Sequence, residues 1–89
     1  MSKFNVYLTI NSEVTCIMEN LSAEQAYDYG ISSEAYSQWC GTRWKVTRRP
    51  QALLKLKTSD MNEMICLAYQ KPSNIPGMDI EHVYAQKIL

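Results

Sequence analysis

The sequence is poor in the residues from which cross-links, metal sites and catalytic centres are built. Its three cysteines, Cys16, Cys40 and Cys66, lie far apart and form no Cys-x-x-Cys pair, which argues against a disulfide framework and a zinc site. Its one histidine, His82, has no acid at the spacing of a catalytic pair, and no glycine-rich phosphate loop is present. We therefore expect reduced thiols, no catalytic residues, no metal and no cofactor.

Long apolar stretches are missing as well. A membrane-spanning helix needs about 18 consecutive apolar residues, and the sequence has no such run. Its first residues turn polar too early for the core of a signal peptide. Apolar residues make up 46% and charged residues 20% of the 89 residues, which is typical of a folded protein with the length of one domain. We expect a single-domain cytoplasmic protein over residues 1–89 with no membrane partner.

Negative charge is absent from one segment of a chain whose net charge is zero. We call residues 43–57 the basic segment, because they hold six cations and no acid. The residues before this segment carry a net charge of minus four, and the residues after it carry a net charge of minus two. Such a segment is typical either of a solvated surface or of a nucleic-acid contact.

The beginning and the end of the chain carry different periodic patterns. Apolar and polar residues alternate through KFNVYLTI and again through VTCIM, with a turn-forming Asn-Ser-Glu between them, which predicts a β-hairpin over residues 1–19. Residues 59–70 fit a helix by their apolar spacing, although their alternation also allows a strand. A loop with two prolines follows, and residues 80–89 then fit an amphipathic helix.

Between these parts the apolar spacing becomes helical, beginning at Ser22. Ser22 and Gln25 have the spacing of a capping box, which predicts that a first helix begins here. Gly30 would end this helix after about two turns, because glycine adopts a left-handed backbone without strain. Ser32 or Ser33 would then cap a second helix. The sequence therefore predicts two short helices separated by a sharp turn.

This helix pair resembles the helix-turn-helix of phage repressor-like DNA-binding domains. In that family a small residue precedes the turn glycine by four positions, as Ala26 precedes Gly30. Apolar residues follow the glycine after one, six and nine positions, as Ile31, Tyr36 and Trp39 do. The two aromatic side chains would lie on one face of the second helix and pack against the first.

The resemblance extends over residues 21–57, because a proline-started helix often follows the motif in small phage and mobile-element regulators, and Pro50 suits such a start. It implies a DNA-binding transcriptional regulator that acts as a homodimer on double-stranded DNA. Residues 32–41 would read a short operator from the major groove. The implied base contacts are Ser33, Glu34, Ser37 and Gln38. The implied phosphate contacts are Ser22, Ser32, Arg43, Lys45, Arg48 and Arg49.

We therefore predict an α+β fold, with an N-terminal β-hairpin, a helix-turn-helix-like pair and further short helices. Residues 59–89 would form a C-terminal helix, a loop and a terminal segment. A second function stays open, because the size, neutral charge and lack of catalytic residues are also similar to those of anti-CRISPR and other counter-defence proteins of phages. Such an inhibitor would bind a host protein complex, for example by adding the edge of its hairpin to a partner's sheet.

Overall fold

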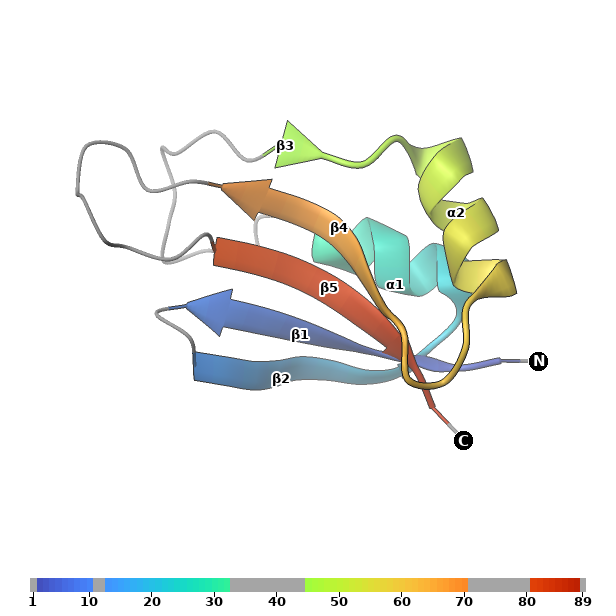
Figure 1. The fold of residues 1–89 in the computed structure, drawn as a ribbon, viewed down its shortest axis with the longest axis horizontal. Coiled ribbons are helices and arrows are strands. Elements are labelled where there is room, and N and C mark those ends of the chain that lie inside the picture. The colour runs from blue at the N-terminus through green and yellow to red at the C-terminus, as the bar shows by residue number, and fades with distance from the viewer. Residues whose placement is uncertain (1, 11–12, 33–44, 71–80, 89) are drawn as a thin grey trace.

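The computed structural model describes residues 2–10, 13–32, 45–70 and 81–88, and within these ranges the chain forms one antiparallel sheet covered by a layer of two helices (Figure 1). The strands are β1 (Phe4–Ile10), β2 (Glu13–Leu21), β3 (Lys45–Val46), β4 (Met64–Gln70) and β5 (Glu81–Lys87), and the helices are α1 (Ala23–Gly30) and α2 (Arg49–Thr58). Across the sheet the strands are ordered β2-β1-β5-β4-β3. The predicted α+β class is confirmed.

The predicted hairpin is formed by β1 and β2, which pair antiparallel. Alternation along β1 buries Phe4 and Val6 against the helices and places the intervening side chains on the opposite face. The register shifts on either side of Val6. Near the first shift, Asn20 has a φ of 62° and its N–H donates to Asn5 Oδ1 over 3.1 Å. These irregularities bend the outer strand β2.

Helix α1 begins and ends where the sequence predicts. Ser22 Oγ accepts from the Gln25 N–H over 3.2 Å, and Gln25 Oε1 accepts from the Ser22 N–H over 3.1 Å, which completes the capping box. A glycine was predicted at the end of α1 because it can adopt a left-handed backbone, but the backbone of Gly30 is not left-handed. A Cβ at Gly30 would instead collide with the buried side chain of Leu67 on β4. Gly30 therefore allows α1 to lie close to the sheet.

The second helix of the predicted pair, with Tyr36 and Trp39, lies outside the described residues except for Ser32. The helix-turn-helix therefore stays a prediction. The helix predicted to begin with Pro50 is present as α2, and Pro50 lies in its first turn. Ala52 on this helix is fully buried.

For residues 59–70 the sequence left a helix and a strand open, and the strand is correct, because β4 lies there. The amphipathic helix predicted for residues 80–89 is wrong, because the chain forms β5 there. Along β5, Val83 and Ala85 are buried while His82 and Tyr84 are only half-buried, which is a period of two. β5 pairs with β1 on one side and with β4 on the other. Pairing with two neighbours decides the structure of a segment whose spacing also fits a helix.

The hydrophobic core lies between the sheet and the helix layer. Its buried members are Phe4, Val6, Ala23, Ala26, Tyr27, Ala52, Leu56, Ile65, Leu67, Ala68, Val83 and Ala85. The helices contribute mainly alanine, so their backbones can approach the sheet closely. In the described part of the chain, both helices lie on this one face, and the opposite face of the sheet has no helix over it.

Candidate nucleic-acid interface

The described cations of the basic segment are all exposed. They are carried by β3, by the connection that follows it and by α2, and they are Lys45, Arg48, Arg49, Lys55 and Lys57. Arg43, the sixth cation of this segment, lies outside the described residues. Exposed cations are the side chains with which proteins contact the phosphates of a nucleic acid.

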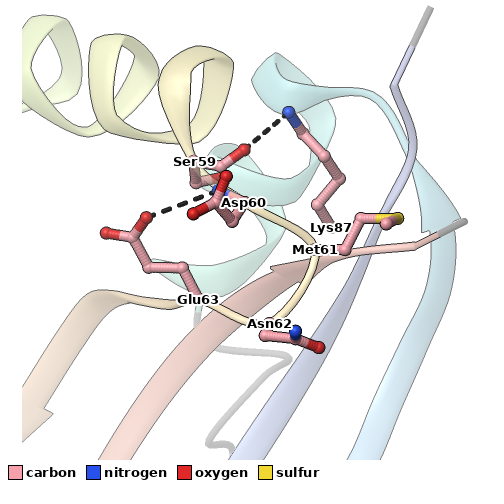
Figure 2. Close-up of a pocket in the computed structure, with 6 residues that line it drawn as sticks. All are labelled: Ser59, Asp60, Met61, Asn62, Glu63 and Lys87. Carbon is pink, nitrogen blue, oxygen red and sulfur yellow. Dashed lines mark hydrogen bonds between the residues drawn. The ribbon is translucent and has the colours of Figure 1, made fainter.

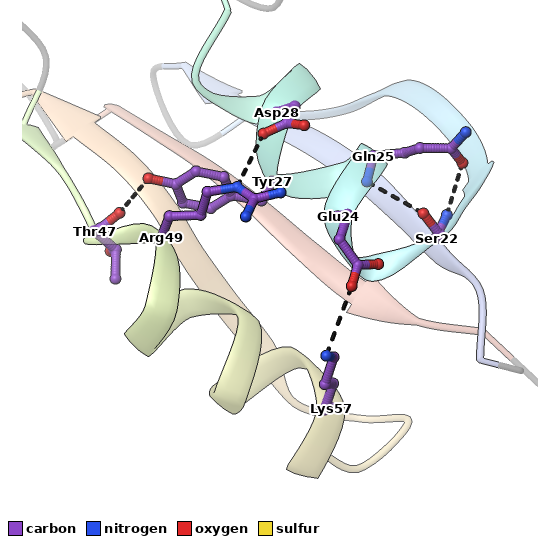
Figure 3. Close-up of polar contacts among 8 residues, drawn as sticks. All are labelled: Ser22, Glu24, Gln25, Tyr27, Asp28, Thr47, Arg49 and Lys57. Carbon is purple, nitrogen blue, oxygen red and sulfur yellow. Dashed lines mark hydrogen bonds and ion pairs between the residues drawn. The ribbon is translucent and has the colours of Figure 1, made fainter.

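Two of these cations contact acids of α1 (Figure 3). Arg49 Nε lies 3.5 Å from Asp28 Oδ1, and Lys57 Nζ lies 3.6 Å from Glu24 Oε1. A hydrogen bond from its own backbone N–H lowers the pKa of Glu24, and Lys57 lowers it further. All four side chains are about half exposed or more, and exposed ion pairs contribute roughly 0–1 kcal/mol to stability. A phosphate can therefore compete for Arg49 and Lys57.

The serines predicted as phosphate contacts already make hydrogen bonds at the two ends of α1. Ser22 Oγ caps the first turn, and Ser32 Oγ donates to the carbonyl oxygen of Tyr29 over 2.6 Å. Their role toward DNA stays a prediction. The predicted base contacts lie outside the described residues, and they are Ser33, Glu34, Ser37 and Gln38.

The face of the sheet opposite the two described helices is a second candidate surface, which the sequence patterns did not reveal. We call it the tyrosine face. It consists of the residues on four strands that face away from the core, namely Asn5, Tyr7, Thr9, Lys45, Met64, Cys66, Tyr69, His82, Tyr84 and Gln86. The alternation in β1 indicated three of these ten residues, namely Asn5, Tyr7 and Thr9. Because a helix was predicted for residues 80–89, the pairing of Tyr84 with Tyr7 could not be predicted.

Two tyrosines stack at the centre of the tyrosine face. Tyr7 on β1 and Tyr84 on β5 are opposite each other in the register, with ring centroids 5.3 Å apart and an angle of 22° between the ring planes. The register places Cys16 on β2 next to Tyr7 and Cys66 on β4 next to Tyr84. A cross-strand row therefore runs Cys16, Tyr7, Tyr84, Cys66.

A cation lies beside a third tyrosine in the neighbouring row. Lys45 on β3 is opposite Tyr69 on β4, and Lys45 Nζ lies 5.9 Å from the centroid of the Tyr69 ring. Tyr69 is in turn opposite His82 on β5. None of the ten residues that define the tyrosine face is acidic. This surface therefore combines two half-buried aromatic rings and one exposed ring with a positive charge at Lys45.

The two thiols of the stacked row are not activated nucleophiles. Burial raises the pKa of Cys66, and desolvation followed by the nearby carboxylate of Glu19 raises the pKa of Cys16. Each thiol donates to a carbonyl oxygen two residues further along its strand, at 3.6 Å in both cases. Because a protonated thiol is a poor nucleophile, the raised pKa lowers the reactivity of both cysteines.

A hollow of about 690 Å³ lies at the turn between α2 and β4 (Figure 2). Its lining residues are Ser59, Asp60, Met61, Asn62, Glu63 and Lys87. Lys87 Nζ donates to the carbonyl oxygen of Ser59 over 2.8 Å, and the Asp60 N–H donates to Glu63 Oε2 over 3.4 Å. These contacts stabilise the turn and tie it to β5, so we assign this hollow a structural role.

No family model, curated protein or solved structure matches this chain. Its function is therefore inferred from the two described surfaces. Within the ranges that the structure describes, no helix has the length and apolar character needed to cross a membrane. The same ranges contain no group of three or more His, Cys, Asp or Glu side chains that could hold a metal ion.

Proposed function

We propose that this protein binds double-stranded DNA as a small cytoplasmic transcriptional regulator of the phage or mobile-element kind, with the basic segment as its phosphate contact. The observation that carries the proposal is the exposure of five cations from one acid-free segment. Contacts to phosphate supply affinity without sequence information. Base readout would come from residues 32–41, and two copies would bind two half-sites of an operator.

The phosphate contact can be tested by exchanging one lysine inside the basic segment and one outside it. Lys55 on α2 and Lys3 ahead of β1 are both exposed, and alanine removes the same charge at either position. We expect Lys55→Ala to lower the slope of log affinity against log salt by about 0.9, the value for one lost phosphate contact, and Lys3→Ala to leave it unchanged. The measurement is fluorescence anisotropy with a labelled duplex at several salt concentrations.

Two results of this titration contradict the proposal at different levels. Equal slopes for Lys55→Ala and Lys3→Ala would show that the basic segment is not the phosphate contact. If no duplex binds below about 10 micromolar at low salt, where non-specific binding is strongest, then DNA binding itself is wrong.

A second function, inhibition of a host protein complex, draws support from β2. This nine-residue strand lies at the edge of the sheet, and residues 13–16 are exposed. An exposed edge can accept a strand from a partner. Because the register between β1 and β2 shifts on both sides of Val6, only residues 13–16 of β2 form a regular stretch that could pair with a partner's strand. Protection of the β2 amides from hydrogen exchange in a complex with a host protein would support this function, and unchanged exchange would contradict it.

A further inference from the structure

The stack at the centre of the tyrosine face is bordered on both sides by short side chains. Tyr7 and Tyr84 stack on each other, so each ring has one outer face directed along the row. The neighbours on these sides are Cys16 and Cys66, whose side chains are too short to cover an aromatic ring. Both thiols donate hydrogen bonds to backbone carbonyl oxygens of their own strands. The stack can therefore be extended by a third flat ring.

The charges around the stack differ between its two ends. Next to Tyr7, the carboxylate oxygen Oε1 of Glu19 lies 3.9 Å from Cys16 Sγ. At the other end, Tyr69 is the next residue after Cys66 on this face of β4, and Lys45 Nζ lies over the Tyr69 ring. A flat ligand with negative charge is thus repelled from the β2 end and attracted to the end formed by β4 and β3.

We propose that the tyrosine face binds single-stranded DNA, with one base stacked on the outer face of Tyr84 above Cys66 and the adjoining phosphate near Lys45. The inference rests on the proposed function, from which it takes DNA as the ligand. Bases stack on aromatic side chains without sequence preference, while cations follow the backbone. The base must be unpaired, because bases within a duplex are covered on both faces by their neighbours.

The central experiment measures how Tyr84→Leu and Tyr84→Phe change the binding of two single strands that have the same length. Anisotropy titrations use labelled oligothymidine of about 12 nucleotides and an abasic strand that carries the same phosphates. We expect Tyr84→Leu to weaken oligothymidine binding about tenfold, since it removes one stacking partner. Tyr84→Phe keeps the ring and should change affinity by less than about twofold. The abasic strand should bind all three proteins equally, and more weakly than oligothymidine binds the unchanged protein.

A second measurement leaves the tyrosines intact, so it remains informative if Tyr84→Leu does not fold. In a Cys16→Ser/Cys40→Ser background, Cys66 is the one thiol left to react with a thiol reagent. Oligothymidine should slow this reaction, because the stacked base lies above Cys66, whereas the abasic strand should leave the rate unchanged. Equal rates with and without oligothymidine would overturn the inference.

The remaining outcomes separate this inference from the proposed function. Equal losses for Tyr84→Leu and Tyr84→Phe, or equal binding of the abasic strand and oligothymidine, would overturn stacking. If oligouridine RNA binds more tightly than oligothymidine, DNA is not the ligand. If neither strand binds, the inference is wrong and a protein partner becomes the alternative ligand of the tyrosine face. If Lys55→Ala weakens duplex binding and Tyr84→Leu leaves single-strand binding unchanged, the proposed function is retained and the stacking site is rejected. If Tyr84→Leu weakens single-strand binding and Lys55→Ala leaves duplex binding unchanged, the stacking site is retained and the regulator of double-stranded DNA is rejected.

Discussion

Single residues decide how closely the helix layer approaches the sheet. Ala26 on α1 and Ala52 on α2 are fully buried, and a larger side chain at either position would push a helix outward. Gly30 is the extreme case, because even a methyl group would meet the buried Leu67. The sequence indicated Gly30 as a helix end, yet it could not reveal this contact, since Leu67 lies far away along the chain.

The packing role of Gly30 predicts that Gly30→Ala destabilises the protein. The added methyl group must displace Leu67 in a filled core, and such overpacking typically costs about 1–3 kcal/mol of unfolding free energy. Urea denaturation followed by circular dichroism measures this change. The double variant Gly30→Ala/Leu67→Val should lose less stability than the sum of the two single variants, because the smaller valine leaves room for the methyl group. Additive losses would contradict the contact.

At the scale of elements, the sequence was reliable where the deciding signals are local. The capping box of Ser22 and Gln25 and the proline near the start of α2 depend only on residues within the same turn, and both helices begin there. The identity of β5 depends on pairing with strands that are distant in the sequence. Because β5 was expected to be a helix, the row formed by Tyr7 and Tyr84 could not be predicted, and the three residues that β5 contributes to the tyrosine face were missed.

The short strand β3 is held in place by contacts from a helix and from β4, which leads to a prediction about Tyr27. Tyr27 on α1 is buried, and its hydroxyl donates to the carbonyl oxygen of Thr47 over 2.7 Å (Figure 3). Tyr27→Phe leaves this carbonyl without that donor, so we expect a loss of about 1 kcal/mol in unfolding free energy. Hydrogen exchange should accelerate at Thr47, whose N–H donates to the carbonyl oxygen of Leu67 on β4, while β1 stays protected. Unchanged exchange at Thr47 would show that the pairing of β3 with β4 suffices.

At the scale of the whole molecule, the basic segment connects both candidate surfaces. Its first described cation, Lys45, lies on the tyrosine face, whereas Lys55 and Lys57 lie on α2 in the helix layer. The cations are therefore distributed over two layers instead of forming one flat patch. A nucleic acid that contacts both groups must pass around the edge of the sheet at β3, which a flexible single strand can do more readily than a stiff duplex.

The oligomeric state of the whole molecule separates the two functions inferred from the sequence. One short recognition helix reads too few base pairs for useful selectivity, so an operator-binding protein needs two copies about one DNA turn apart. We expect light scattering at micromolar concentration to give twice the chain mass of 10.3 kDa. Lys55→Ala should keep this mass, because Lys55 is proposed to contact phosphate and not a second chain. A protein that stays monomeric with and without DNA would contradict the regulator and favour the inhibitor, since one copy suffices to occupy a partner's surface.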